Sequence, residues 1–394
     1  MKKRVAVIGS GITGVTTAYY LVKSGFHVTV IDEELYPAMK TSYSNGGQVS
    51  VSNSEVWNTW SNVQKGVKWL LKKDAPLLIR PQLSISQWNW MYKFLINTIK
   101  DTYKENTEKT ISLGLEARKL YNEICEEENI LFDRSDCGIL HFYKDKKYFK
   151  AAKNAKEIYN SNGVEWDILN LEDITKIDSN LSSIPNIIGG IYTPSDWTGD
   201  IHAFCYGLTL ILKEKYGVNF FFGIKAQKLQ EILDIYDFIV VSAGIGSVNL
   251  AKTIEEKLDI YPVKGYSLTI RNNPIELLPK VSLLDDQAKI VSATLGDKLR
   301  IAGTAEFVGE NYDIRKDRIE PLLKWVHTNF PKINTHDYSS WSCLRPMTPN
   351  MLPIVKQSVK NPKVFYNTGH GHLGWTISPT TAKQVVEMIK SQLL

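Results

Sequence analysis

The stretch RVAVIGSGITGVTTAYYLVKSGFHVTVID, residues 4–32, decides the fold class. It starts with a short continuous apolar run, Arg4 to Ile8, which is typical of a strand buried on both faces of a parallel sheet. A helical pattern follows and closes at Gly25, and a second strand, HVTVID, ends at Asp32. Strand, helix and strand in this order predict the first βαβ unit of a Rossmann-like α/β domain.

The glycine motif GSGITG lies between the first strand and the helix. Gly9 permits the tight turn, Gly11 lets the backbone approach a pyrophosphate, and Gly14 lets helix and strand pack closely. The free N–H groups and the positive dipole end of the helix then face the phosphates. Asp32 is placed to bind a ribose 2′-hydroxyl, which argues against NADP. We predict a dinucleotide site formed by Val7, Ile8, Gly9, Ser10, Gly11, Ile12, Thr13, Gly14 and Asp32; the alternative is a glycine-rich turn without a ligand.

Length and composition limit the remaining possibilities. A chain of 394 residues exceeds the size of one hydrophobic core, so we expect two domains. No run of about 18 uncharged apolar residues is available to span a bilayer, and the apolar run after the basic start is too short for a secretion signal. Four scattered cysteines argue against a disulfide framework or a structural zinc site, and a net charge of +5 without a Lys/Arg block does not indicate nucleic acid. We expect a cytoplasmic protein.

Three further glycine-containing segments are candidates for cofactor contacts. The loop TSYSNGGQ supplies Ser44, Asn45, Gly46 and Gln48, and the strand Phe238 to Val241 leads into Ala243 and Gly244. The segment NTGHGHLGWT, residues 367–376, supplies Gly369, His370, Gly371, Leu373 and Gly374. For the first two segments the alternatives are a surface loop and a simple strand-to-helix turn. A metal site at His370 and His372 is disfavoured because no cluster of ligands accompanies them, and His372 is interpreted as incidental.

Six motifs, distributed over nearly the whole chain, resemble the D-amino-acid oxidase superfamily of two-domain flavoproteins, and within it the bacterial D-amino acid dehydrogenase small subunits. They are TSYSNGGQ, KWLLKKDAPL, PVKGYSLTI, GTAEFVG, LRPMTPN and NTGHGHLGWT. The resemblance implies an FAD-binding domain made of residues 1–55, 202–260 and 340–394. Residues 56–201 and 261–339 would form a substrate-binding domain with an antiparallel sheet.

The activity that this resemblance implies is FAD-dependent oxidative deamination of D-amino acids to 2-oxo acids and ammonia. A hydride would leave Cα for the flavin N5, and the electrons would pass to a quinone or another acceptor. The resemblance assigns Arg345 as the anchor of the substrate carboxylate, and a guanidinium can give that group two parallel hydrogen bonds. Tyr266 is a weaker candidate for a second contact in the pocket, with a core tyrosine as the alternative. The glycine loop at residues 369–374 would lie against the flavin's pyrimidine edge.

Several features depart from the resembled pattern. The crossover between the strands VNFFF and FIVVSAG is too short for the β-meander that the family carries there. Asn350 stands where aspartate is common. Cys343 could link the flavin covalently, as a cysteine near this point does in the related sarcosine oxidases, or be a small buried side chain. Ser378 and Pro379 have the residue types of an N-cap and a first helical position, so we expect the last helix to begin there.

The segment 57–100 is rich in tryptophan and in basic residues. It contains five tryptophans and seven lysines or arginines against one acid, a composition that can bind an anionic membrane surface. Because the resembled family is associated with the inner membrane, we expect peripheral contact there; the alternative is core packing with a solvated basic face. Two rival functions also stay open. One is a glycine or sarcosine type of amine oxidase that uses oxygen, and the other is a flavin-binding subunit without catalytic activity.

Overall fold

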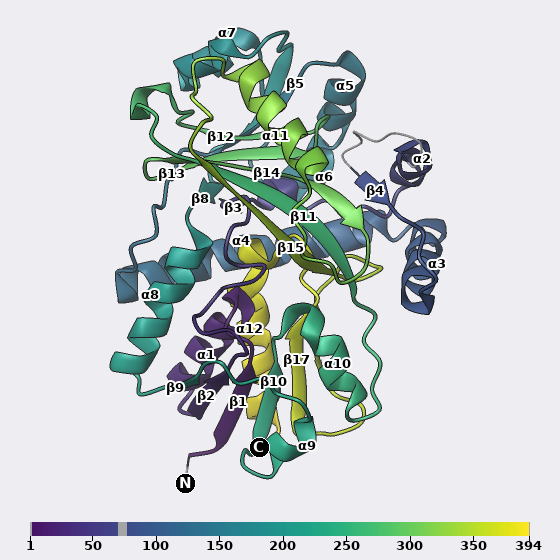
Figure 1. Ribbon diagram of the computed structural model, residues 1–394, viewed down its shortest axis with the longest axis vertical. Coiled ribbons are helices and arrows are strands. Elements are labelled where there is room, and N and C mark those ends of the chain that lie inside the picture. Colours follow the sequence, from purple (N-terminus) through teal and green to yellow (C-terminus); the bar gives the residue numbers. More distant parts are fainter. Residues whose placement is uncertain (1, 70–76, 394) are drawn as a thin grey trace.

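A computed structural model describes residues 2–69 and 77–393 and organises them around two sheets, one above the other in Figure 1. The strands are β1 (Arg4–Ile8), β2 (His27–Ile31), β3 (Gln48–Val49), β4 (Leu77–Ile79), β5 (Ile139–Tyr143), β6 (Asp167–Leu169), β7 (Gly189–Thr193), β8 (Trp197–Thr198), β9 (Asn219–Phe221), β10 (Phe238–Val241), β11 (Tyr261–Ile270), β12 (Ser282–Asp285), β13 (Ile290–Leu295), β14 (Lys298–Phe307), β15 (Tyr338–Met347), β16 (Ile354–Gln357) and β17 (Val364–Thr368).

The helices join these strands and cover the sheets. The α-helices are α1 (Ile12–Lys23), α2 (Trp60–Trp69), α3 (Ile85–Ile99), α4 (Tyr103–Glu128), α5 (Lys146–Asn154), α6 (Lys156–Ser161), α7 (Leu171–Ile177), α8 (Ile201–Glu214), α9 (Leu229–Leu233), α10 (Ser247–Lys252), α11 (Lys316–Asn329) and α12 (Gly374–Ser391). Short 3₁₀ turns are η1 (Val51–Asn53), η2 (Ser179–Ser183), η3 (Gly244–Gly246) and η4 (Ile275–Leu277).

The first sheet has six strands in the order β16–β17–β10–β1–β2–β9 and is parallel except for β16. The predicted βαβ unit is confirmed as β1, α1 and β2. The chain leaves β1 toward β2 on one side, whereas β10 lies on the other side, so a topological switch point falls between β1 and β10. Ligands of open α/β sheets bind at the carboxyl ends of strands beside such a point. The short crossover from β9 to β10 contains only α9 among its elements, as expected.

The second sheet is mixed and mostly antiparallel, as the resemblance implies. Its order is β15–β11–β14–β13–β12–β5–β7–β6, with β4 added beside β14. β15 falls largely within residues assigned from the sequence to the cofactor domain, yet it pairs with β11 over ten residues in this second sheet. The domain boundaries stay a prediction, and the pairing of β15 places one strand of the 340–394 portion with the other sheet.

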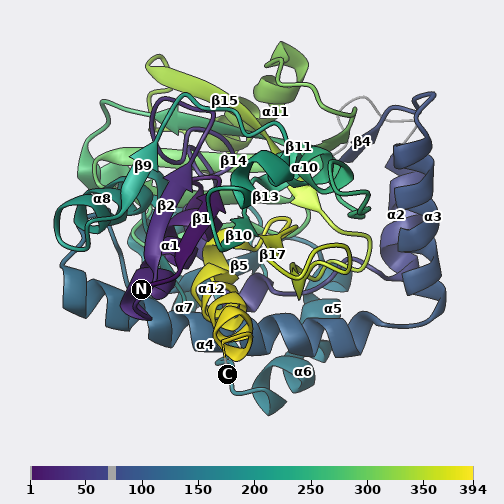
Figure 2. The same cartoon turned by 90° about the horizontal axis from the view of Figure 1, so that it is seen from below.

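The long helix α4 runs across the width of the molecule in both views and lies against α12 (Figures 1 and 2). The Tyr121 ring packs edge-on against Trp197, Phe204 and Trp375. These residues belong to the same buried cluster as β1, α1 and β2, so residues from the 56–201 segment help to build the core beneath the parallel sheet.

The prediction that the last helix begins at Ser378 and Pro379 is wrong. α12 begins at Gly374, and Pro379 lies inside it. Proline lacks the N–H that would bond to the carbonyl four residues earlier, that of Trp375. In the tertiary structure the Tyr121 hydroxyl donates a hydrogen bond to this carbonyl at 2.7 Å. The Tyr121 hydroxyl on α4 therefore replaces the missing N–H donor to the Trp375 carbonyl. No residue pattern near Pro379 indicates this contact.

Candidate active site

A cavity of about 410 Å³ opens at the carboxyl ends of the parallel strands, where the switch point predicts a ligand. Of the residues predicted from the sequence to bind the cofactor, those lining it are Ile8, Gly9, Gly11, Ile12, Thr13, Asp32, Ala243, Gly244, Gly369, His370, Gly371 and Gly374. They come from four separated parts of the chain. Thr41 and Ser42, which belong to the polar loop predicted to wrap the cofactor, also line the cavity. The cavity has further walls that were not assigned to the cofactor from the sequence, and these include Asn249 and Thr368.

The turn after β1 has room only for glycine at two positions. Gly9 has φ +104°, and a Cβ atom there would lie 2.5 Å from the carbonyl oxygen of Ser242 on the neighbouring strand end. A Cβ atom on Gly14 would lie 1.8 Å from the Gly9 carbonyl oxygen. The backbone at the start of α1 is therefore open to the cavity. This cradle fits the pyrophosphate of an extended dinucleotide such as FAD.

Asp32 is held rigidly at the cavity wall. Its Oδ2 accepts hydrogen bonds from the backbone N–H of Ser10 at 2.5 Å and from the Ser10 hydroxyl at 2.6 Å, and its Oδ1 accepts from Glu34 N–H at 2.8 Å. Ser10 itself is fully buried and does not line the cavity. We infer that Ser10 orients the carboxylate, while a contact between Asp32 and a ribose stays a prediction.

The Asn45 loop divides into two parts. Thr41 and Ser42 line the cavity, whereas residues 44–48 pack on the second sheet. Ser267 donates to the Ser44 carbonyl at 2.6 Å, Arg300 donates to the Asn45 carbonyl at 2.9 Å, and Gln48 donates to Ser282 at 2.8 Å. A Cβ atom on Gly46 would lie 2.5 Å from a methyl of Val291. This part of the loop joins the cavity to the sheet above it, and its contacts with the cofactor stay a prediction.

The C-terminal glycine loop lies against the end of β15. Gly371 N–H donates to the Pro346 carbonyl at 3.0 Å, and Gly369 and Gly371 both have positive φ. His370 lines the cavity; its Nε2 lies 2.9 Å from the Thr381 hydroxyl, and burial lowers its pKa to about 3. His372 stacks on Trp57 with ring centroids 5.0 Å apart. Leu373 is buried immediately before α12 and does not line the cavity.

Arg345 is placed by irregular backbone on three neighbouring strands. Its guanidinium lies over Gly265, where a Cβ atom would come within 2.4 Å of Cζ, and β11 has a register shift at this point. It donates to the Thr304 carbonyl at 3.0 Å, and Thr304 has φ +59°, which is unusual for a β-branched residue. Bulges and such backbone outliers are common beside active sites.

The charge of Arg345 lacks a carboxylate within 4.0 Å among residues 2–69 and 77–393. Burial lowers its pKa, but a guanidinium stays protonated under ordinary conditions. One hydrogen bond to a carbonyl leaves several N–H donors for another partner. A partly buried cation with spare donors is stabilised by an anionic partner, so the geometry suits a carboxylate ligand.

Tyr266 lies elsewhere. Its side chain is buried in the core of the second sheet, and its hydroxyl donates to Glu306 at 2.7 Å. Neither Tyr266 nor Arg345 is among the residues that line the cavity. Cys343 does line it, with its Sγ 3.4 Å from the Thr41 hydroxyl, and burial raises the pKa of its thiol. Asn350 accepts a hydrogen bond from Leu352 N–H at 3.2 Å and so stabilises its own turn.

No group of three or more His, Cys, Asp or Glu side chains converges on a common point in the part of the chain that the structure describes. Within the same residues, no helix is long and apolar enough to cross a membrane.

Comparison with known proteins gives full-length matches. The sequence model of the family described as FAD dependent oxidoreductase (DAO) matches residues 4–388. The chain is 43% identical to D-amino acid dehydrogenase 3 of Mesorhizobium japonicum, covering 99% of this chain and 98% of that protein. It is 34% identical to the D-amino acid dehydrogenase of Dechloromonas aromatica, covering 99% and 97%. Among solved structures, glycine oxidase from Geobacillus kaustophilus superposes with a TM-score of 0.76 at 15% identity, covering 99% and 95%, which is a likeness of fold.

Proposed function

Because this chain belongs to the DAO family of FAD-dependent oxidoreductases, we propose that it is a D-amino acid dehydrogenase that converts D-amino acids to 2-oxo acids and ammonia. The observation that carries the proposal is the partly buried guanidinium of Arg345, which has spare donors and no carboxylate partner within 4.0 Å among the described residues. It stands two residues from Cys343 and next to Pro346, both of which line the cofactor cavity.

Arg345 would bind the substrate through two parallel N–H···O bonds to its carboxylate, which fixes the plane of that group and the direction of the neighbouring Cα–H bond. The positive charge of Arg345 also lowers the pKa of a nearby amine, and the neutral amine is the form from which hydride can leave. FAD, when bound, supplies the hydride acceptor. The imino acid product then reacts with water, so the protein needs no further covalent step.

The proposal is tested by mixing the purified flavoprotein anaerobically with D-alanine, L-alanine, D-proline, glycine and sarcosine. We expect D-isomers to bleach the flavin absorbance, while L-alanine, glycine and sarcosine leave it unchanged. Bleaching by glycine or sarcosine alone would favour the oxidase alternative. If none of the amines bleaches the flavin, the chain is a flavin-binding subunit without this activity and the proposal fails.

Cys343 is the observation that favours the oxidase alternative, because its thiol lines the cofactor cavity. Its raised pKa keeps it protonated and a poor nucleophile, which argues against a covalent link to flavin. Acid precipitation separates the two cases. We expect yellow colour in the supernatant; colour retained in the precipitated protein, and lost in Cys343→Ala, would establish the link.

We further propose that the electrons pass to a quinone at an anionic membrane surface, reached through α2, β4 and α3. Large exposed apolar side chains gather there, and they are Trp60, Val67, Leu83, Ile85, Trp88, Tyr92 and Ile99. Lys68, Arg80 and Lys100 are exposed in the same segment, and α2 and α3 lie together at one edge of the molecule (Figure 2). Residues 70–76, with Lys72, Lys73 and the centre of KWLLKKDAPL, lie outside the described residues.

Some tryptophans of the segment 57–100 are not part of the exposed surface proposed to contact the membrane. Trp60 is 54% exposed and Trp88 is 53% exposed, but Trp90 is only 5% exposed and belongs to a buried cluster. Trp57 stacks on His372 near the candidate active site. Sedimentation with vesicles of anionic lipid tests the proposal. Binding should fall when Trp60 and Trp88 are both changed to Ser, and should not fall in the matched buried-face control Phe94→Leu; equal binding by all three proteins would contradict it.

A further inference from the structure

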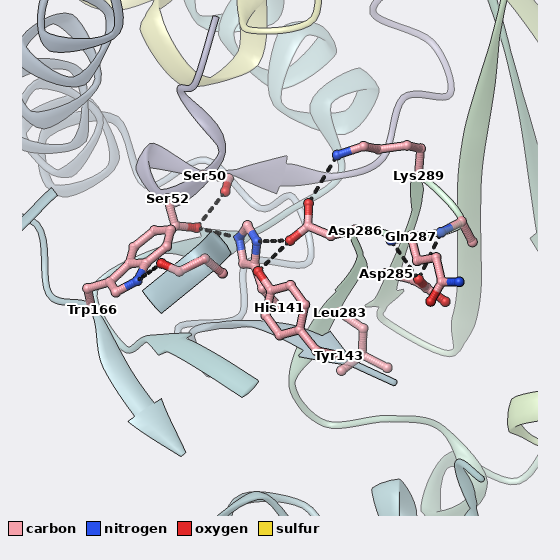
Figure 3. Close-up of polar contacts among 12 residues, drawn as sticks. Ser50, Ser52, His141, Tyr143, Trp166, Leu283, Asp285, Asp286, Gln287 and Lys289 are labelled. Atoms are coloured by element: carbon pink, nitrogen blue, oxygen red, sulfur yellow. Dashed lines mark hydrogen bonds and ion pairs between the residues drawn. The ribbon is translucent and has the colours of Figure 1, made fainter. Parts of the chain in front are cut away.

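A buried polar network lies at the turn between β12 and β13 (Figure 3). The carboxylate of Asp286 accepts hydrogen bonds from the Tyr143 hydroxyl at 2.6 Å, from His141 Nδ1 at 3.2 Å and from the Lys289 ammonium at 3.2 Å. On its other side, His141 Nε2 lies 3.0 Å from the hydroxyl of Ser52. Tyr143 and His141 thus fix the position of the Asp286 carboxylate, and that carboxylate binds the Lys289 ammonium.

The turn itself is rigid. Asp285 accepts from the N–H groups of Gln287 at 3.1 Å and Ala288 at 2.9 Å, and from Trp325 Nε1 at 2.9 Å. Lys289 adopts φ +54°, a left-handed conformation that few lysines adopt. Its side chain is 53% exposed, against 22% for Asp286. The ammonium is therefore positioned by the protein and remains accessible, and Asp286 uses only one of its three N–H donors.

Strand register brings Lys289 close to Arg345. Ile290 pairs with Gly303, so Lys289 lies opposite Thr304, and a Cβ atom on Gly303 would be 3.1 Å from the Lys289 carbonyl oxygen. The Thr304 carbonyl is the group that accepts from Arg345. Val291, two residues after Lys289, faces the cofactor loop at Gly46. Lys289 itself precedes β13 in a left-handed turn, from which its ammonium reaches Asp286.

The charges around this region favour an anion. Burial, followed by the charges of Arg345 and Lys289, lowers the pKa of His372 to about 4, so this ring stays neutral. Burial alone would lower the pKa of Lys289, but Asp286 and Glu55 outweigh it and raise the pKa, so Lys289 keeps its charge. Two cations therefore stay charged here. Arg345 has no carboxylate within 4.0 Å among the described residues, and Lys289 pairs with Asp286 through one of its three N–H donors.

We propose that Lys289 is a specificity-determining residue that binds the side-chain carboxylate of acidic D-amino acids, D-aspartate and D-glutamate, while Arg345 binds the α-carboxylate. The proposal rests on the proposed function, since it names the substrate class of that same site. A dicarboxylate would match two cations that flank Thr304 from neighbouring strands, whereas a cationic side chain would meet Lys289 and be repelled.

The test compares kcat/KM for D-glutamate, D-aspartate, D-glutamine, D-alanine and D-lysine, with a dye as electron acceptor. D-glutamine matches D-glutamate in size and lacks its charge. We expect the holoenzyme to prefer the acidic substrates over D-glutamine and D-lysine. In Lys289→Met, kcat/KM for the acidic substrates should fall by about 30-fold or more, mainly through KM, while the values for D-alanine and D-glutamine change less than about threefold.

Lys65→Met is the matched control, because Lys65 also acts on Glu55 electrostatically but stacks on the Tyr148 ring, 5.0 Å from its centroid. It should leave the ratio of D-glutamate to D-glutamine unchanged. A wild-type enzyme that oxidises D-alanine but does not favour acidic substrates over D-glutamine would overturn the inference without any variant. Equal losses for all substrates in Lys289→Met would also overturn it. Failure with every D-amino acid would instead refute the proposed function.

Discussion

Replacing Arg345 by methionine separates a substrate anchor from a structural arginine, because the two roles predict opposite effects. Methionine keeps much of the length and removes the charge. Two charge-assisted hydrogen bonds to the substrate carboxylate contribute about 1.5–3 kcal/mol each, so about 3–6 kcal/mol is lost with them. At 1.36 kcal/mol per factor of ten, kcat/KM for a D-amino acid should fall by about 10² to 10⁴.

The free energy of unfolding of Arg345→Met should rise or stay unchanged, although its activity falls. The guanidinium is partly buried, with one hydrogen bond to the Thr304 carbonyl and no carboxylate within 4.0 Å in the described chain. Removing it leaves that carbonyl without its donor, at a cost of about 1–3 kcal/mol, but also removes a desolvation penalty of several kcal/mol. We therefore expect the free energy of unfolding of Arg345→Met to equal or exceed that of the wild type.

The assay has two parts on the same flavin-loaded preparations: the rate of anaerobic flavin reduction by the best D-amino acid substrate, and urea unfolding. Arg345→Lys is the control that keeps a charge but not the two parallel bonds, and it should recover only part of the lost rate. The reasoning is refuted if Arg345→Met is less stable by more than about 3 kcal/mol while it reduces its flavin within threefold of the wild-type rate.

Three further predictions concern the cofactor cradle and the core. Gly14→Ala places a Cβ atom 1.8 Å from the Gly9 carbonyl oxygen and should give protein without flavin absorbance. Gly66→Ala, where a Cβ atom meets only a Leu77 methyl at 3.9 Å, should keep the flavin, and a yellow Gly14→Ala protein would contradict the cradle. Tyr121→Phe should lower the free energy of unfolding by about 1–3 kcal/mol, because it removes the donor to the Trp375 carbonyl. Adding Pro379→Ala should restore part of this loss by supplying an N–H group. Additive losses in the double-mutant cycle would contradict the coupling between Tyr121 and Pro379. Burial would raise the pKa of Glu256, but hydrogen bonds from Lys356, Ser358 and Tyr366 lower it below 4.5, so its contribution to stability is present above that pH and is lost as the pH falls further. Lys356→Met should therefore destabilise the protein at pH 7 and flatten its acid unfolding profile, and an unchanged profile would show that this pair does not control it.

Predictions from the sequence were most accurate where neighbouring residues determine the backbone conformation. The turn at Gly9 and Gly14 admits no Cβ, and a glycine needed for such close approach is visible in the sequence as a glycine. The same holds for the apolar strand β10 and for the glycine loop beside His370, whose element types depend on neighbouring residues. These local features were sufficient to predict the parallel sheet and many of the residues that line the cavity.

Predictions from the sequence failed where a residue far away in the chain changes the local structure that a short motif normally forms. Pro379 has the signature of a helix start, but Tyr121 satisfies the carbonyl that proline leaves open, and so the helix begins five residues earlier than Pro379. The interpretation of His372 as incidental stays a prediction; its ring stacks on Trp57, a contact that the sequence did not indicate. Partners separated by hundreds of residues leave no periodic signal.

The sequence by itself determined that the chain begins with a dinucleotide-binding βαβ unit, because spacing and residue type specify a backbone that can cradle phosphate. Tertiary structure alone decided which charged groups share the site. Arg345 lies on β15 and Lys289 immediately precedes β13, and only the pairing of β15, β11, β14 and β13 brings them to opposite sides of Thr304. Electrostatic energy depends on distance and burial rather than on order along the chain, so the chemistry of the substrate pocket becomes readable only after folding.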